Sequence, residues 1–145
     1  MKHTKISADK VRIGQMRYFD MEGNGTEIPK EKGYAFAIRI VKMVKMLSKD
    51  RCLFSIYDQV LRSGTSISAN IHEAEFAQST SDFISKLSIS LKEANETKHW
   101  LDLLKDTDCI TIPQHESIMS DCKELIALLV SSIKTLKRNA SVVVK

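Results

Sequence analysis

Helix-breaking residues lie almost entirely at the beginning of this chain, and their distribution constrains the fold more than any other feature of the sequence. Most of the five glycines and two prolines fall before residue 34, whereas apolar residues recur at intervals of three and four from there to about residue 138. Apolar side chains at that spacing line one face of an α-helix. Leu, Ile, Met and Ala carry most of the apolar content, and this balance favours helix over sheet. The sequence therefore predicts an all-α fold.

The periodic region divides into four predicted helices with short connections. They cover residues 32–49, Leu53 to about Phe76, the turn at 78–82 to about Lys105, and Thr111 to about Arg138. Ser79 or Thr80 is a natural N-cap for the third helix, and Thr111 with Gln114 resembles a capping box before the fourth. The small residues SGTSISAN at 63–70 fit a helix only where another helix approaches closely. Helices of these lengths predict an antiparallel up-down-up-down four-helix bundle over residues 31–139.

The two ends of the chain differ from the predicted bundle. Residues 1–30 contain the turn-rich segment MEGNG and show no sustained helical period, so we expect an N-terminal arm that is flexible or forms a short hairpin. Residues 140–145 are expected to form a C-terminal tail that frays. The chain has no apolar run of about 18 residues and no signal-peptide pattern, so we expect no membrane partner.

The three cysteines are widely spaced and form no CxxC pair. An odd number of scattered cysteines argues against a disulfide framework. Reduced thiols are typical of the cytoplasm, which is the location that we predict.

The first predicted helix has more apolar surface than one bundle core can cover. Its cations share an arc of about 120°, and the remainder of its circumference is apolar. Because a large exposed apolar surface usually marks an interface, this helix predicts a homo-oligomer. The cations are candidate contacts to the phosphates of RNA or DNA, together with a nearby arginine: Arg39, Lys42, Lys45, Lys49 and Arg51. The alternative interpretation is an ordinary solvated helix face, which is the commoner outcome for charge at helical spacing.

Charge is distributed unevenly along the chain. Residues 31–62 have a net charge of +4 and residues 63–112 a net charge of −4, within a total of +4. Such asymmetry suits either an anionic partner or contact between subunits.

A set of polar residues recurs on one face of the second predicted helix and one face of the third. Its members are Arg62, Ser66, Asn70, Glu73, Glu93 and Glu96. Because these helices run antiparallel, Arg62 should lie near Glu93 or Glu96. We predict a partly buried structural network that fixes the register of the two helices, with a solvated surface as the alternative and a catalytic role disfavoured.

Signatures of catalysis and metal binding are weak in this sequence. A ferritin-like di-metal site needs two Glu-x-x-His pairs and two further glutamates, and the chain has one such pair, Glu96 and His99. No cysteine has a histidine nearby in sequence, and no GxSxG motif or glycine-rich phosphate loop is present. We therefore expect no enzymatic activity, no metal and no cofactor.

Residues 61–104 resemble a known family of four-helix-bundle proteins. The matching segments are RSGTSI (62–67), ANI (69–71) with Glu73, Phe83-Ile84, LKEANET (91–97) and Trp100-Leu101. That family includes the proteins encoded in intervening sequences of 23S ribosomal RNA genes and the accessory variability determinants of diversity-generating retroelements. The resemblance implies an antiparallel bundle, a barrel-like homopentamer and no known enzymatic activity. In the retroelement branch it also implies a basic ring that binds nucleic acid and the reverse transcriptase.

These observations lead to two functional hypotheses. The first is a non-enzymatic oligomeric scaffold that binds the backbone of RNA or DNA electrostatically, with little base readout. The second is a protein-interaction module, such as an accessory subunit of a reverse transcriptase.

Overall fold

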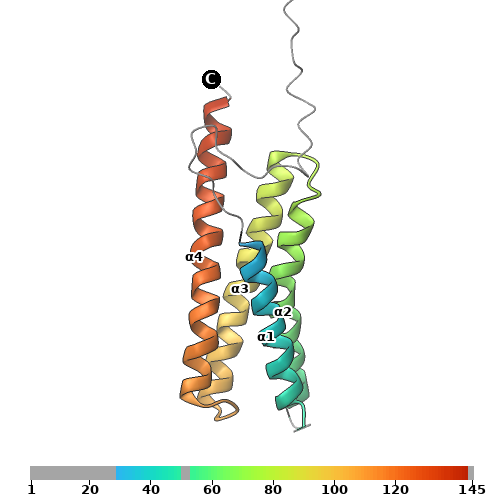
Figure 1. Ribbon diagram of the computed structural model, residues 1–145, viewed down its shortest axis with the longest axis vertical. Helices are drawn as coiled ribbons and strands as arrows, with labels where there is room; N and C mark the ends of the chain where they lie inside the picture. Colours follow the sequence, from blue (N-terminus) through green and yellow to red (C-terminus); the bar gives the residue numbers. More distant parts are fainter. Residues whose placement is uncertain (1–28, 50–52, 144–145) are drawn as a thin grey trace, which may run out of the picture.

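The chain forms an antiparallel bundle of four α-helices in a computed structural model that describes residues 29–49 and 53–143 (Figure 1). The helices are α1 (Lys30–Leu47), α2 (Phe54–Ala74), α3 (Thr80–Asp106) and α4 (Ile112–Val143). This is the all-α bundle that the sequence predicts. The predicted N-terminal arm, up to residue 28, and the candidate residue Arg51 lie outside the described residues.

Local signals in the sequence account for the helix boundaries. The Ser79 hydroxyl accepts a hydrogen bond from the Asp82 backbone N–H at 3.0 Å, which caps α3. Before α4, the Thr111 N–H donates to Gln114 Oε1 at 2.9 Å and the Gln114 N–H donates to Thr111 Oγ1 at 3.3 Å, so the predicted capping box is confirmed. The helix itself is longer than predicted, because no glycine or proline stops it at residue 140. The expected frayed tail is instead helical through Val143.

A continuous apolar core runs along the inside of the bundle. Each helix contributes side chains at three- and four-residue spacing, such as Ile40, Ile67, Leu87 and Leu129, all of them fully buried. Burying such a side chain stabilises the fold by about 1.5–3 kcal/mol. None of the described helices is long and apolar enough to cross a membrane.

Small residues bring α2 close to both of its neighbours. Gly64 lies directly against Ile40 of α1, where no side chain would fit. On the other side of α2, the Ser63 and Thr97 hydroxyls lie 2.9 Å apart in the interior, and the Ser90 hydroxyl donates to the Ile67 carbonyl at 2.9 Å. The predicted role of the SGTSISAN segment is thus confirmed: it is helical, and it permits close approach.

The contact between α1 and α4 is looser than the other contacts in the bundle. α1 packs along α2, α2 along α3 and α3 along α4, whereas α1 and α4 meet at few points. Two ion pairs span the gap between them, Lys32 with Glu124 and Arg39 with Asp121. This arrangement leaves α1 exposed along much of its length, and α1 carries the candidate binding residues.

Candidate functional site

The outward face of α1 carries three of the cations that the sequence selects as candidate phosphate contacts. Lys42, Lys45 and Lys49 are all exposed, the last of them just after the end of the helix. Within the described residues, none of the three pairs with a carboxylate.

Arg39 is placed differently from those lysines. Its Nη2 donates to the Ser117 hydroxyl at 2.9 Å, its Nη1 donates to the Ser117 carbonyl at 3.3 Å, and the same Nη1 pairs with Asp121. The guanidinium therefore ties α1 to α4. Its periodic spacing with the lysines indicated a shared arc but could not reveal this partner, which lies 82 residues away in the chain.

Exposed apolar side chains lie beside the lysines on α1. Tyr34, Ile38 and Val41 follow one another at helical spacing and expose 64%, 40% and 45% of their surface. We call these three residues the apolar stripe. The bundle core does not cover it, as the excess apolar surface of this helix predicts.

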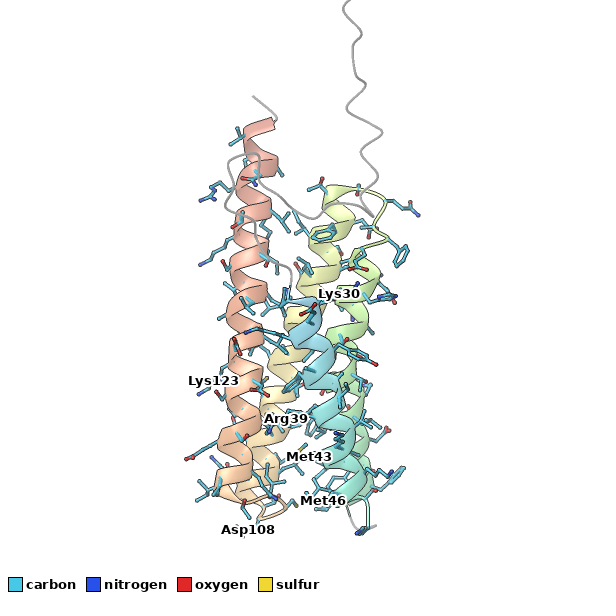
Figure 2. The ribbon with its side chains drawn as sticks, in the orientation of Figure 1. Lys30, Arg39, Met43, Met46, Asp108 and Lys123 are labelled. Atoms are coloured by element: carbon cyan, nitrogen blue, oxygen red, sulfur yellow. The ribbon has the colours of Figure 1, made fainter. Side chains whose placement is uncertain are left out.

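Figure 2 shows how the residues of α1 descend toward the connection between α3 and α4. Arg39, Met43 and Met46 follow in that order, and Asp108 marks the connection at the same end of the bundle. Met46 is half exposed. This end of α1 thus presents thioethers as well as cations.

The polar residues of α2 and α3 meet around Arg62. Its Nη1 lies 3.2 Å from Glu93 Oε2, and its Nη2 pairs with Glu96. The Trp100 indole N–H also donates to Glu96, at 3.2 Å. The hydrogen bond from Arg62 lowers the pKa of Glu96, with the Trp100 bond as the next cause, while the bond to Glu96 raises the pKa of Arg62.

The other members of the predicted network do not join this cluster. The Ser66 hydroxyl donates to the Arg62 carbonyl at 2.6 Å, and the Asn70 side chain donates to the Ser66 carbonyl at 2.8 Å, so both bond within their own helix. Glu73 pairs with Lys86 at 2.7 Å, and this contact raises the pKa of Lys86. Lys86 is not among the residues that the sequence pattern predicts for this network, although the turn between the two helices places it opposite Glu73.

Two described groups with possible chemical reactivity, Cys122 and His115, are buried. Burial raises the pKa of the Cys122 thiol to about 11, which disfavours the thiolate that nucleophilic chemistry needs. His115 Nε2 lies 2.8 Å from Asp102 Oδ1, where the two side chains join the ends of α3 and α4. Across residues 29–49 and 53–143, no three His, Cys, Asp or Glu side chains gather as a metal site would require.

Comparisons with known proteins agree on one group. The family model of the 23S rRNA-intervening sequence protein matches residues 28–131. A solved structure from Bacteroides thetaiotaomicron VPI-5482, described as a protein with unknown function from the S23 ribosomal protein family, is 55% identical. It superimposes with a TM-score of 0.70 over 72% of this chain and 97% of that chain. No curated protein matches the chain.

Proposed function

The chain belongs to the 23S rRNA-intervening sequence protein family, and from this premise we propose that it is a non-enzymatic, cytoplasmic, oligomeric scaffold that binds the backbone of nucleic acid. Lys42, Lys45 and Lys49 would supply the phosphate contacts. Arg39, which the sequence groups with them, would instead hold α1 to α4.

The observation that carries this proposal is the exposed lysine face of α1, which lacks acidic partners within the described residues. Each phosphate that a lysine neutralises releases counterions and adds salt-dependent affinity. Lysine acts as a flexible point charge, so such contacts read no base sequence. The names of the family and of its solved member, which refer to ribosomal RNA and a ribosomal protein family, agree with an RNA setting.

Self-assembly would be driven by the apolar stripe. Its side chains cost free energy in water, and a second copy of the chain would cover them. In a closed ring, the lysine faces of successive subunits would repeat along one surface. Binding at several such faces raises the apparent affinity without any new kind of contact. The family resemblance gives a pentamer as the expected ring.

The direct test is fluorescence anisotropy with labelled mixed-sequence RNA and DNA over a range of salt concentrations. Replacing Lys42, Lys45 and Lys49 together by Gln should weaken binding and flatten the salt dependence, by up to about 0.9 in slope per lost phosphate contact on duplex DNA. The matched control replaces three exposed lysines of α4, Lys123, Lys134 and Lys137, by Gln. Equal losses in both triple variants, or no binding to the parent protein at low salt, would refute the proposal.

A protein-interaction module is the second candidate, and the apolar stripe is the observation that favours it. Phosphate contacts give no role to exposed Tyr34 and Ile38, whereas a protein partner such as a reverse transcriptase would cover them. Affinity capture from the native host, with and without nuclease, distinguishes the two. The interaction module would be favoured by one dominant protein that still co-purifies after nuclease treatment. That protein should no longer co-purify with the Ile38→Glu variant.

A further inference from the structure

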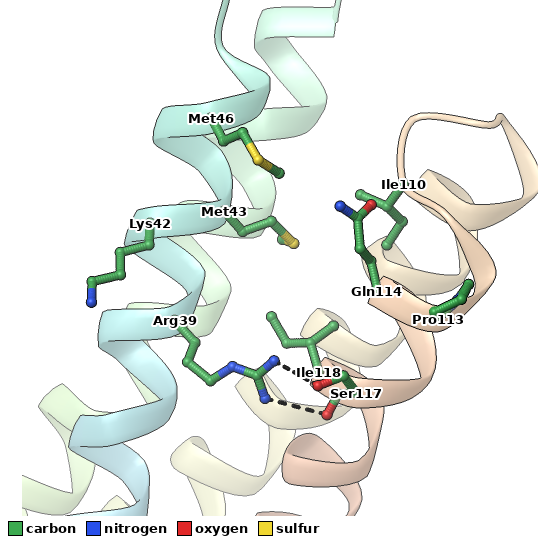
Figure 3. A pocket seen from close by; sticks show the side chains of 9 residues that line it. All are labelled: Arg39, Lys42, Met43, Met46, Ile110, Pro113, Gln114, Ser117 and Ile118. Carbon is green, nitrogen blue, oxygen red and sulfur yellow. Dashed lines mark hydrogen bonds between the residues drawn. The ribbon is translucent and has the colours of Figure 1, made fainter.

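A groove lies between the end of α1 and the beginning of α4, two helices that meet at few points (Figure 3). Its volume is about 440 Å³. The residues that line it are Arg39, Lys42, Met43, Met46, Ile110, Pro113, Gln114, Ser117 and Ile118. The groove is open to solvent at the half-exposed Met46.

Most of the groove surface is apolar. Met43 and Met46 project toward α4 from one side, and Ile110 and Ile118 face them from the other (Figure 3). Methionine is unbranched and polarizable, so it adapts to ligands of different shape. The walls thus suit the hydrocarbon part of a small molecule.

Arg39, Gln114 and Ser117 supply the polar groups that line the groove. Ser117 offers its carbonyl and its hydroxyl oxygen to Arg39, and the Gln114 Oε1 accepts from the Thr111 backbone N–H. Within the described residues, the Nε–H of Arg39 and the Nε2 amide of Gln114 have no acceptor. A ligand that accepts hydrogen bonds but donates none can pair with donors of this kind.

The charges on the groove point to the same kind of ligand. Its two charged lining residues are both cations, Arg39 and Lys42; the Lys42 side chain points away from the groove, so Arg39 supplies the charge that faces it (Figure 3). Asp121 pairs with the Nη1 atom of Arg39, which leaves the Nε edge of the guanidinium available. Arginine binds carboxylates through such an edge, with two parallel hydrogen bonds where geometry allows.

We propose that this groove binds a small monocarboxylate with an apolar tail, its carboxylate beside Arg39 and its tail against Met43, Met46 and Ile118. The volume falls within the range of about 300–1,000 Å³ that is typical of ligand pockets. A phosphodiester chain fits the site less well, because its sugar would place hydroxyl groups against thioether and isoleucine walls. This site borders the proposed nucleic-acid contacts at Lys42, but it needs neither Lys45 nor Lys49.

The test titrates three ligands of equal chain length, octanoate, 1-octanol and octylammonium, into ¹⁵N-labelled full-length protein. Chemical shifts of backbone amides and methionine methyl groups report where each ligand binds. We expect saturable shifts centred on Met43, Gln114 and Ser117, with octanoate binding at least tenfold more tightly than octanol and octylammonium most weakly. Equal affinity for the three ligands, shifts elsewhere on the bundle, or no saturable shift with octanoate would overturn the proposal.

Three variants make the assignment specific. Met46→Glu places a negative charge at the half-exposed mouth and should weaken octanoate binding at least tenfold while leaving octanol less affected. Ser131→Glu adds the same charge at an exposed position of α4 far along the helix and should leave both affinities unchanged. Arg39→Gln should reduce octanoate affinity to that of octanol, and retention of the preference in this variant would contradict the proposed carboxylate position.

Discussion

A Cβ atom on Gly64 would lie 2.8 Å from Cγ1 of Ile40, so α1 and α2 meet at a separation that only glycine permits at this position. The nearest atoms include Cγ2 and Cβ of Ile40, at 2.9 and 3.2 Å, which stand close to the backbone and cannot swing away. The position of α1, and with it the lysine face and the groove, therefore depends on this one contact.

Gly64→Ala should destabilise the bundle. Overpacking a core costs about 1–3 kcal/mol, and the better helix propensity of alanine returns at most about 1 kcal/mol. We expect a net loss of about 1–2 kcal/mol in the free energy of unfolding, measured by urea denaturation at fixed protein concentration.

Gly33→Ala is the matched control for that substitution. Its Cβ would lie 3.0 Å from Cδ1 of Ile71, the far end of a side chain that can rotate. The loss of stability should therefore be smaller than for Gly64→Ala. A Gly64→Ala variant as stable as the parent protein would show that α1 can shift freely on α2.

Asp108→Gly should stabilise the protein. Asp108 has a backbone φ of 60°, the left-handed region that favours glycine, in the connection between α3 and α4. The strain in a non-glycine residue there is about 1 kcal/mol, so we expect a gain of up to about 1 kcal/mol and a rise in Tm. Asp106→Gly, at the end of α3, is the control and should not raise the stability, because glycine is a slightly poorer helix former than aspartate. The prediction is wrong if both substitutions lower the Tm.

The contact between Arg62 and Glu96 should make stability depend on pH in the acidic range. The pKa of Glu96 lies below its ordinary value in the folded protein, chiefly because Arg62 donates a hydrogen bond to it. The folded state therefore releases this proton more readily than the unfolded state does. The stabilisation is present above the ordinary pKa of a glutamate and is lost as the pH falls through the folded value.

Because the Arg62–Glu96 pair is partly exposed and screened by solvent, it should contribute no more than about 1 kcal/mol to the free energy of unfolding. Glu96→Gln should reduce the fall in stability below about pH 4.5, as urea denaturation at several pH values would show. Glu116→Gln removes an exposed glutamate that has no ion pair within the described residues, and it should preserve the parent profile. Identical profiles for the two variants would rule out the assigned role of Glu96.

The sequence predicts those features of this fold that depend on local signals. The caps at Ser79 and Thr111 are set by side chains three residues from the N–H groups they bond, and the core positions follow from helical period. The position of Arg62 beside Glu93 and Glu96 can also be predicted from the sequence, because a short connection fixes the register of two antiparallel helices.

Features that depend on how α1 sits against α4 could not be read from the sequence. The pairing of Arg39 with Asp121 joins helices at opposite ends of the chain, and no periodicity relates their registers. The groove beside Met43 lies between two helices that meet at few points, which is a property of the whole packing arrangement. For the same reason, the spacing of Arg39, Lys42, Lys45 and Lys49 could not separate the engaged arginine from the exposed lysines.

Thiol reactivity should differ strongly between the two described cysteines. Cys122 is fully buried, and its pKa is raised to about 11, whereas Cys109 is half-buried near the surface of the connection after α3. In a Cys52→Ser background, iodoacetamide should modify Cys109 under native conditions and reach Cys122 only when the protein unfolds. Mass spectrometry of the intact protein and its peptides measures both rates, and rapid native modification of Cys122 would contradict the burial of this thiol.

Val41→Glu should separate assembly from the charge of the binding face. Val41 is 45% exposed in the single chain, so the substitution should leave the fold of one bundle intact. If a second copy covers the apolar stripe, a buried carboxylate without a partner will oppose that contact, and the native mass should fall to that of a monomer. Nucleic-acid affinity should then fall more than tenfold although Lys42, Lys45 and Lys49 remain, because multivalent binding is lost. Val41→Gln, which adds a polar group but no charge beside Lys42 and Lys45, controls for the added charge and should lower the native mass and the affinity as well. An unchanged native mass in Val41→Glu would exclude the apolar stripe as the assembly surface, whereas a monomer of undiminished affinity would leave the lysine face active without a ring.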